Sequence, residues 1–132
     1  MRIVVDTNVI VRLFVDDDDE QASRAAAAVA GRDRVALPIT ALCEAVWVWR
    51  SIYRLERSEV RRALLALLEI PSVAVDGPAL AAGLAFLDAG ADFADGVICF
   101  QGRALGGETF VTFDADAARA ARRSGTTALV PD

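Results

Sequence analysis

The hydrophobic positions along this 132-residue chain fall into short apolar runs separated by longer segments with helical periodicity. The short runs are rich in β-branched residues and do not alternate with polar ones, which is typical of strands buried on both faces of a parallel sheet. The sequence therefore predicts strands at residues 3–5, 35–37, 72–76, 109–114 and 127–130.

The segments between these runs predict helices. Their ranges are 9–15, 16–30, 38–55, 59–69, 78–87, 92–105 and 115–125. The acidic run DDDDE at 16–20 is expected to open the second helix as a solvated loop, and Ser58, followed by Glu59, is expected to cap the fourth. Strands and helices alternate throughout, which predicts an α/β fold with a central parallel sheet and helices on both faces.

Length and composition favour one domain. The chain has the size of an ordinary domain, and no repeat, linker or low-complexity segment divides it, so a single domain over residues 1–132 is expected. No apolar stretch approaches the roughly 20 residues of a membrane span, and the start lacks the pattern of a signal peptide. We therefore expect no membrane contact and a cytoplasmic location. Cys43 and Cys99 are expected to be buried free thiols.

Charge and residue usage restrict the chemistry. The chain contains no histidine, which removes imidazole from any catalytic scheme or metal site. It also contains no lysine, so all 14 basic residues are arginines, whose planar guanidinium suits phosphate recognition. A net charge of −5 argues against a passive nucleic-acid coat, although an enzyme that meets phosphate through a bound cation remains compatible with it.

Two carboxylates follow predicted strands. Asp6 comes after the apolar run at 3–5, and Asp114 ends the run at 109–114. Ligands of parallel α/β sheets bind beyond the carboxyl ends of the strands, so both residues are site candidates. A second interpretation stays open, because Asp6, Thr7 or Asn8 is also suited to cap the next helix.

Glu44 lies in a helix that is apolar over most of its surface. At helical spacing it shares a face with Ala41, Val48, Ile52 and Leu55. A lone carboxylate on such a face is costly to bury without a partner, which marks Glu44 as a candidate. The alternative is that Glu44 lies at the edge of the face and reaches solvent.

Asp92 and Asp95 are spaced as the cap and the third residue of a helix. Capping alone accounts well for Asp92, because an aspartate there satisfies orphan amide groups and suits the helix dipole. It accounts less completely for Asp95, whose carboxylate can point into the cleft above the strands.

The quartet of Asp6, Glu44, Asp95 and Asp114 predicts a metal site. Two like charges about 4 Å apart repel by roughly 4 kcal/mol at an effective dielectric near 20, so such a group holds protons or a cation. Oxygen ligands without histidine or thiolate favour Mg²⁺ or Mn²⁺ over zinc. The chemistry that such a site supports is metal-assisted hydrolysis of a phosphodiester.

Four ordered blocks resemble the PIN-domain ribonucleases, most closely the VapC-like toxins of prokaryotic type II toxin–antitoxin pairs. The blocks are VVDTNVIV at the start, Glu44 in its helix, DFADGVIC in the middle and VTFDADA near the end. Gly96 and Cys99 stand where similar chains often carry alanine.

The resemblance implies a PIN fold, here a three-layer α/β/α sandwich, with Mg²⁺- or Mn²⁺-dependent endoribonuclease activity. It also implies a homodimer and neutralisation by a cognate antitoxin. The acidic residues of the family correspond to Asp6, Glu44, Asp95 and Asp114, and its small polar residues near the metal to Thr7, Asn8 and Thr112. Asp92 and Asp116 are supporting candidates.

Other functions fit less well. A signalling receiver domain would use Asp76 as its phosphoacceptor, but such domains resemble one another in needing a lysine, which this chain lacks. A haloacid-dehalogenase-like phosphatase would want an aspartate where Asn8 stands. A PIN-like module that binds RNA or a protein without cutting remains an alternative.

Overall fold

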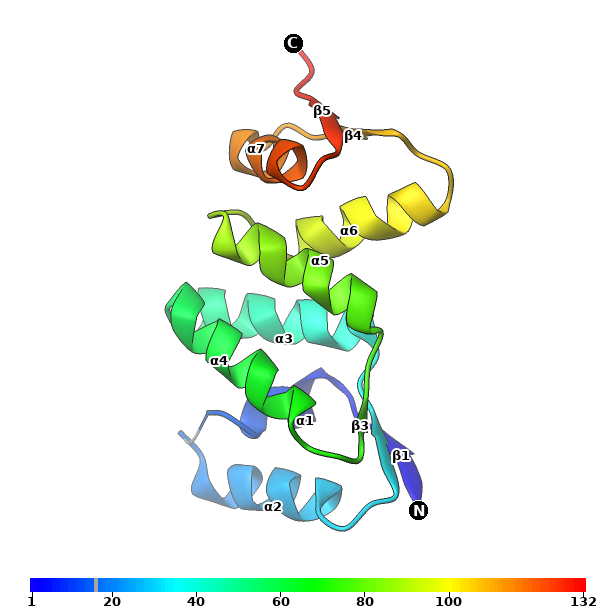
Figure 1. The fold of residues 1–132 in the computed structure, drawn as a ribbon. Coiled ribbons are helices and arrows are strands. Elements are labelled where there is room, and N and C mark those ends of the chain that lie inside the picture. The colour runs from blue at the N-terminus through cyan, green and yellow to red at the C-terminus, as the bar shows by residue number, and fades with distance from the viewer. Residues whose placement is uncertain (16) are drawn as a thin grey trace. The chain divides into compact units, whose positions relative to one another are not determined.

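The computed structural model describes residues 1–15 and 17–132 (Figure 1). Asp16 lies outside the described residues, and so do the predicted helix start at 16 and the first residue of the DDDD run. The chain divides into two compact units, Met1–Asp76 and Gly77–Asp132, and each is described by itself.

The first unit contains a three-stranded parallel sheet in the order β1-β2-β3. The strands are β1 (Arg2–Val4), β2 (Arg34–Ala36) and β3 (Val73–Ala74). Ile3 pairs with Val35, and Val35 pairs in turn with Val73, so the three predicted apolar runs lie in one register. All three strands are parallel, as the sequence predicts.

Four helices complete the first unit, namely α1 (Thr7–Arg12), α2 (Asp19–Val29), α3 (Ile39–Ser51) and α4 (Arg57–Leu68). Trp49 of α3 is fully buried and donates its indole N–H to the carbonyl of Val11, with 3.4 Å between N and O. Its ring also meets Phe14 edge to face, with 5.8 Å between centroids. These contacts fix α1 against α3, and α1 is the helix that follows the first strand.

Several helix ends differ from the predictions: the first helix covers Thr7–Arg12 instead of 9–15, the second begins at Asp19, and two further ends have a clear local cause. The third helix ends at Ser51 instead of about residue 55, because the chain turns through Arg54, whose φ is 55°. The cap of α4 is Glu56 and not Ser58, since Glu56 forms a reciprocal capping box with Glu59. The helix thus begins one residue before the serine that the sequence favoured.

The second unit contains the parallel pair β4 (Thr109–Val111) and β5 (Thr127–Leu129), with Phe110 opposite Ala128. Its helices are α5 (Gly77–Asp88), α6 (Phe93–Ala104) and α7 (Ala115–Arg123). Phe86 meets Phe110 edge to face, with 6.2 Å between centroids, which joins α5 to the strand pair. The buried core around them is rich in alanine and also contains Cys99.

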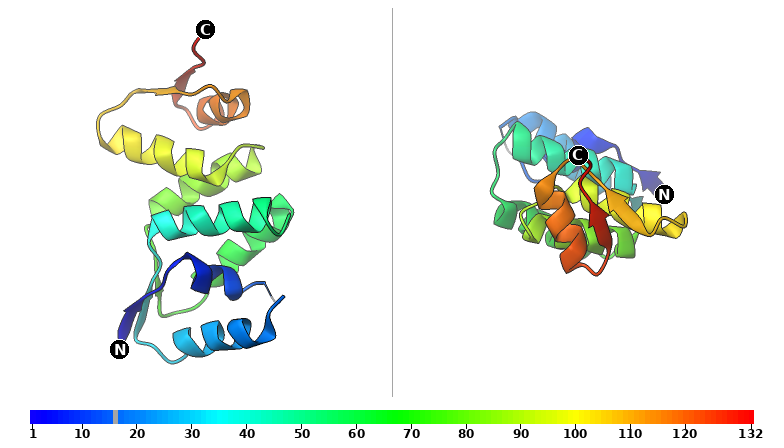
Figure 2. Two further views of the ribbon diagram at one scale, coloured as in Figure 1. Left: turned by 180° about the vertical axis from the view of Figure 1, so that it is seen from behind. Right: turned by 90° about the horizontal axis from the view of Figure 1, so that it is seen from above.

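Helices α5 and α6 lie side by side at close range (Figure 2). A Cβ atom added to Gly96 would lie 2.4 Å from the carbonyl oxygen of Ala82, and one added to Gly83 would lie 2.5 Å from the ring of Phe93. Gly96 is therefore required by the approach of the α5 backbone, and Gly83 by the ring of Phe93 packed against it. Because Asp92 and Asp95 lie at the start of α6, this packing also fixes where their carboxylates stand.

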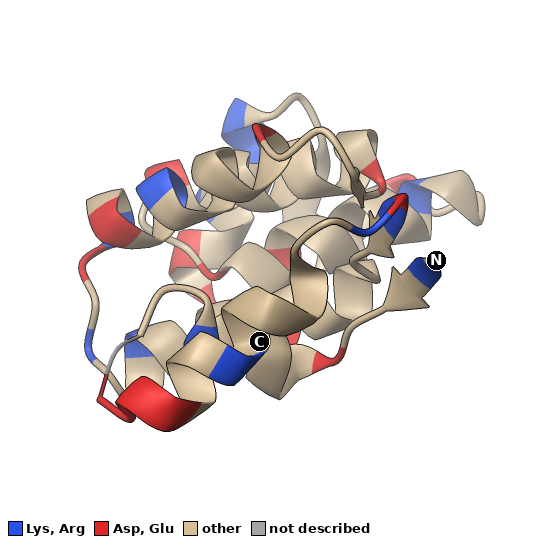
Figure 3. Cartoon of the chain, turned by 90° about the horizontal axis from the view of Figure 1, so that it is seen from below, with Lys and Arg blue, Asp and Glu red and all other residues tan. Residues whose placement is uncertain are grey.

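The parallel pairing and the alternation of strands with helices confirm the predicted α/β class. The two cysteines are free thiols as expected, with Cys99 buried and Cys43 half-buried. Acidic and basic residues are interspersed along the ribbon (Figure 3). None of the helices in the described ranges is long and apolar enough to cross a bilayer.

Candidate metal centre

Asp6 lies at the N-terminus of α1. Its carboxylate accepts a hydrogen bond from the backbone N–H of Val9, with 3.4 Å between O and N, so the capping interpretation holds for Asp6. The residue is nevertheless exposed. Capping therefore leaves the carboxylate open to a ligand.

Thr7 and Glu44 connect α1 with α3. The hydroxyl of Thr7 donates to the Glu44 carboxylate, with 2.8 Å between the oxygens. Glu44 is exposed, so its carboxylate lies at the edge of the apolar face and reaches solvent instead of being buried, and its role in a site stays a prediction. The expected apolar face is also shorter than predicted, because α3 ends before Ile52, which is 60% exposed.

A pocket of about 280 Å³ lies at these residues within the first unit. It is lined by Val4, Val5, Asp6, Thr7, Pro38, Thr40, Ala41 and Glu44. The first unit therefore brings two of the four predicted acidic residues to one pocket, with a threonine that orients one of them.

In the second unit, Asp92, Asp95 and Asp114 form an acidic cluster. One carboxylate oxygen from each lies within 4.8 Å of the others. Asp92 occupies the cap position of α6, yet its side chain makes no capping hydrogen bond. The sequence favoured a capping role for Asp92, but its carboxylate does not cap α6. The Asp92 carboxylate lies beside that of Asp95 instead.

Asp95 is the half-buried member of this cluster. Burial raises the pKa of its carboxyl above the ordinary value, and the neighbouring charges of Asp92 and Asp114 raise that pKa further. A bound cation would relieve both causes. A carboxylate shifted by burial and by two like charges is a candidate for a functional site.

Asp114 caps α7 by accepting from the backbone N–H groups of Asp116 and Ala117, at 2.9 and 3.3 Å. The Thr112 hydroxyl in turn accepts from the backbone N–H of Asp114, at 3.1 Å. These hydrogen bonds hold the Asp114 carboxylate in place between the end of β4 and the start of α7. The Asp116 side chain forms an ion pair with Arg119 and is not a member of the acidic cluster.

Asn8 belongs to a different pocket. It lines a pocket between α1 and α2, together with residues of the alanine-rich helix α2, for which the sequence predicted no site. The sequence feature that could have predicted this pocket is the occurrence of two arginines, Arg12 and Arg24, near the alanines of α2.

The acidic cluster suits a hard divalent cation. Two oxygens on opposite sides of an octahedral Mg²⁺ lie about 4.2 Å apart, since each bond is about 2.1 Å long. The observed separations of up to 4.8 Å need only a small adjustment of side chains to reach that span. The donors are carboxylate oxygens, which select Mg²⁺ or Mn²⁺ over metals that prefer nitrogen or sulfur.

Asp6 and Asp114 each follow a parallel strand and cap the next helix, and Asp114 also belongs to the acidic cluster. The PIN domain family model matches residues 3–123, and the chain belongs to this family. PIN domains are generally metal-dependent nucleases that act on RNA, and the acidic cluster is compatible with that activity. No curated protein matches the chain.

Proposed function

We propose that this protein is a Mg²⁺- or Mn²⁺-dependent endoribonuclease and the toxin of a type II toxin–antitoxin pair. The observation that carries the proposal is the cluster of Asp92, Asp95 and Asp114 at the starts of two helices in a PIN domain. Capping accounts for the Asp114 carboxylate but not for those of Asp92 and Asp95, and a divalent cation would offset most of the repulsion among the three charges.

The proposed metal ligands and catalytic residues are Asp6, Glu44, Asp95 and Asp114. When bound, the cation would polarise the phosphodiester and make water a better nucleophile at neutral pH. Asp6 is exposed at a helix start, and Glu44 is oriented by the Thr7 hydroxyl. Asp114 is held by its own capping bonds. Asp92, Asn8, Thr112 and Asp116 are proposed as supporting residues.

The proposed substrate is RNA, and the proposed protein partners are a cognate antitoxin and a second copy of this chain, acting in the cytoplasm. All basic residues are arginines, which suits contact with phosphate and with acidic protein segments. The match to the PIN family supports the RNA substrate. The toxin role rests on the resemblance of the four sequence blocks.

The test is incubation of the purified chain with structured cellular RNAs in Mn²⁺, in Mg²⁺ and in a chelator. Discrete fragments that require a metal would support the proposal. Intact RNA in all three conditions, together with retained RNA binding, would instead indicate a non-catalytic binding module. The matched variants are Asp95→Asn, which removes a proposed ligand, and Asp19→Asn, which removes an exposed aspartate of α2 outside the acidic cluster.

A further inference from the structure

A second pocket lies within the first unit, between α1 and α2, and the proposed catalytic carboxylates do not use it. Its volume is about 560 Å³, which lies in the range of pockets that take small ligands. It is lined by Asn8, Val9, Arg12, Gln21, Arg24, Ala25, Ala27 and Ala28. The lining thus combines two cations, two carboxamides and a surface of small apolar side chains.

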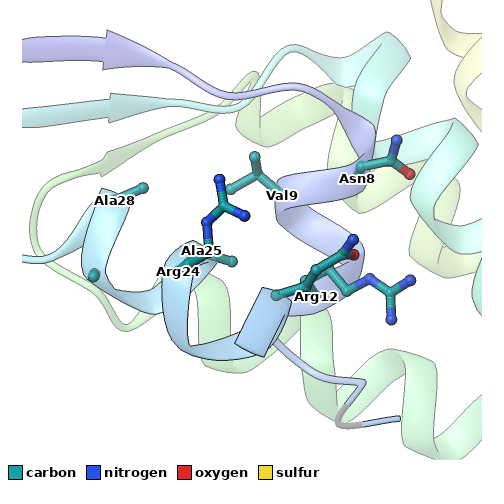
Figure 4. A pocket seen from close by; sticks show the side chains of 8 residues that line it. Asn8, Val9, Arg12, Arg24, Ala25 and Ala28 are labelled. Atoms are coloured by element: carbon teal, nitrogen blue, oxygen red, sulfur yellow. The ribbon is translucent and has the colours of Figure 1, made fainter. Parts of the chain in front are cut away.

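Arg24 is one of the two cations that line this pocket. Its guanidinium extends from α2 toward Val9 on α1 (Figure 4). Among the residues that the structure describes, Arg24 has no carboxylate within ion-pair distance. An arginine whose charge is not compensated, in a chain with a net charge of −5, favours an anionic ligand.

Arg12 is in a different state, because Asp17 already holds it. The Arg12 guanidinium forms an ion pair with Asp17, and the Tyr53 hydroxyl donates to the same carboxylate, with 3.2 Å between the oxygens. Asp17 thus occupies a position where a phosphate oxygen could bind. A ligand phosphate would have to compete with this carboxylate for Arg12.

The remaining lining fits a nucleobase. Asn8 and Gln21 each offer an amide donor and a carbonyl acceptor, which is the pair of groups that reads the edge of a base. The alanines present methyl groups on which a flat ring can rest without steric conflict. Asn8 is also two residues from Asp6 on the same helix start, so the pocket adjoins the proposed catalytic residues of this unit.

We propose that this pocket binds one nucleotide of a single-stranded RNA substrate, with Arg24 on its phosphate, and that Asp17 competes with that phosphate for Arg12. The inference rests on the proposed ribonuclease function and adds a substrate subsite to it. An acidic peptide could satisfy the same arginines and pair its backbone with Asn8 and Gln21, but it would offer no flat ring to rest on the alanine methyl groups.

The experiment measures binding of a short fluorescent single-stranded oligoribonucleotide to the full chain in chelator, where no metal-dependent cleavage occurs. Arg24→Gln should weaken binding about tenfold, as loss of one charge-assisted hydrogen bond predicts. It should also reduce the slope of log affinity against log salt by about 0.7, the contribution of one phosphate contact on a single strand. Asp17→Asn should tighten binding, because it frees Arg12 and keeps the side-chain shape.

The matched control is Arg34→Gln, which removes an exposed arginine of the same unit outside the pocket and should leave affinity and salt slope close to wild type. Equal losses for Arg24→Gln and Arg34→Gln would overturn the proposal, since they would indicate diffuse attraction. Tighter binding of a poly-glutamate peptide than of RNA, with the same dependence on Arg24, would also overturn it and assign the pocket to an acidic protein segment.

Failure of this inference is distinguishable from failure of the proposed function. If Asp95→Asn abolishes cleavage while Arg24→Gln binds RNA like wild type, only the nucleotide pocket is wrong. If the wild type cuts no RNA in any metal, the ribonuclease proposal fails whatever the binding data show.

Discussion

Asp95 is the residue whose environment departs most clearly from that of an ordinary surface carboxylate. It is half-buried and lies beside Asp92 and Asp114, and both effects raise the pKa of its carboxyl. In the metal-free protein the folded state therefore binds a proton more readily than the unfolded chain does. This coupling between protonation and folding gives the residue a measurable signature apart from catalysis.

We predict that Asp95→Asn stabilises the metal-free protein at neutral pH, by at most about 1 kcal/mol because the side chain is partly exposed. As the pH falls toward 3.8, the ordinary value of an aspartate pKa, the wild type takes up the proton in its folded state and gains stability. The difference in Tm between the two proteins should therefore shrink on acidification. Melting curves in chelator across this pH range test it, and a wild type that melts higher than Asp95→Asn at neutral pH would contradict it.

Glu44 leads to a different prediction at the same scale. It is exposed, and its partner is the Thr7 hydroxyl, to which the side-chain oxygen of a glutamine could bind equally well. We therefore expect Glu44→Gln to lose RNA cleavage while changing the Tm of the metal-free protein by less than the effect of Asp95→Asn. Glu69→Gln, at the exposed end of α4, is the matched control for cleavage. Full cleavage activity of Glu44→Gln would remove Glu44 from the metal site.

The sequence predicted the elements well because each signal was local. Unbroken apolar runs gave the parallel strands, and helical periodicity gave the helices. The differences lie at the ends, where one residue decides: the left-handed Arg54 ends the turn after α3, and Glu56 outcompetes Ser58 as a cap. The positions of the candidate carboxylates at helix starts also followed from local pattern.

Contacts between elements could not be predicted in the same way. The bond from Thr7 to Glu44 joins residues 37 positions apart, and the approach of Asp114 to Asp92 depends on how α6 and α7 pack. Gly96 illustrates the limit. The sequence around Gly96 does not predict that another helix approaches it. In the structure, however, Gly96 lies against the backbone of α5.

We predict that Gly96→Ala destabilises the protein by about 1–3 kcal/mol, the usual cost of overpacking. The new Cβ would lie 2.4 Å from the Ala82 carbonyl oxygen, a backbone atom that can move only with its helix. Helix propensity alone predicts the opposite sign, since alanine is favoured over glycine by about 0.5–1 kcal/mol inside a helix. Gly102→Ala, in the same helix with nothing within 4 Å of its added Cβ, should show that gain. Urea unfolding compares the two, and a stabilised Gly96→Ala would show that α5 and α6 separate easily.

At the scale of the whole molecule, the single PIN domain over residues 1–132 stays a prediction. The second unit covers residues 77–132, and its three helices pack around a two-stranded sheet with an alanine-rich core. Units of this size bury a smaller share of their surface than whole domains of ordinary length, so they are marginally stable alone. We therefore expect one cooperative thermal transition with equal calorimetric and van't Hoff enthalpies, and two resolved transitions would contradict a single domain.

The central claim is that the acidic residues of this PIN domain bind a divalent cation that RNA cleavage requires. The measurement that tests it most directly is the rate of RNA cleavage as a function of Mn²⁺ concentration for the wild type, Asp6→Asn and Asp95→Asn, with Asp19→Asn as the control. We predict saturable activation of the wild type and of Asp19→Asn, with no cleavage by the other two at Mn²⁺ concentrations that saturate the wild type. Cleavage by the wild type that persists in chelator, or wild-type activation curves for Asp6→Asn and Asp95→Asn, would contradict the claim.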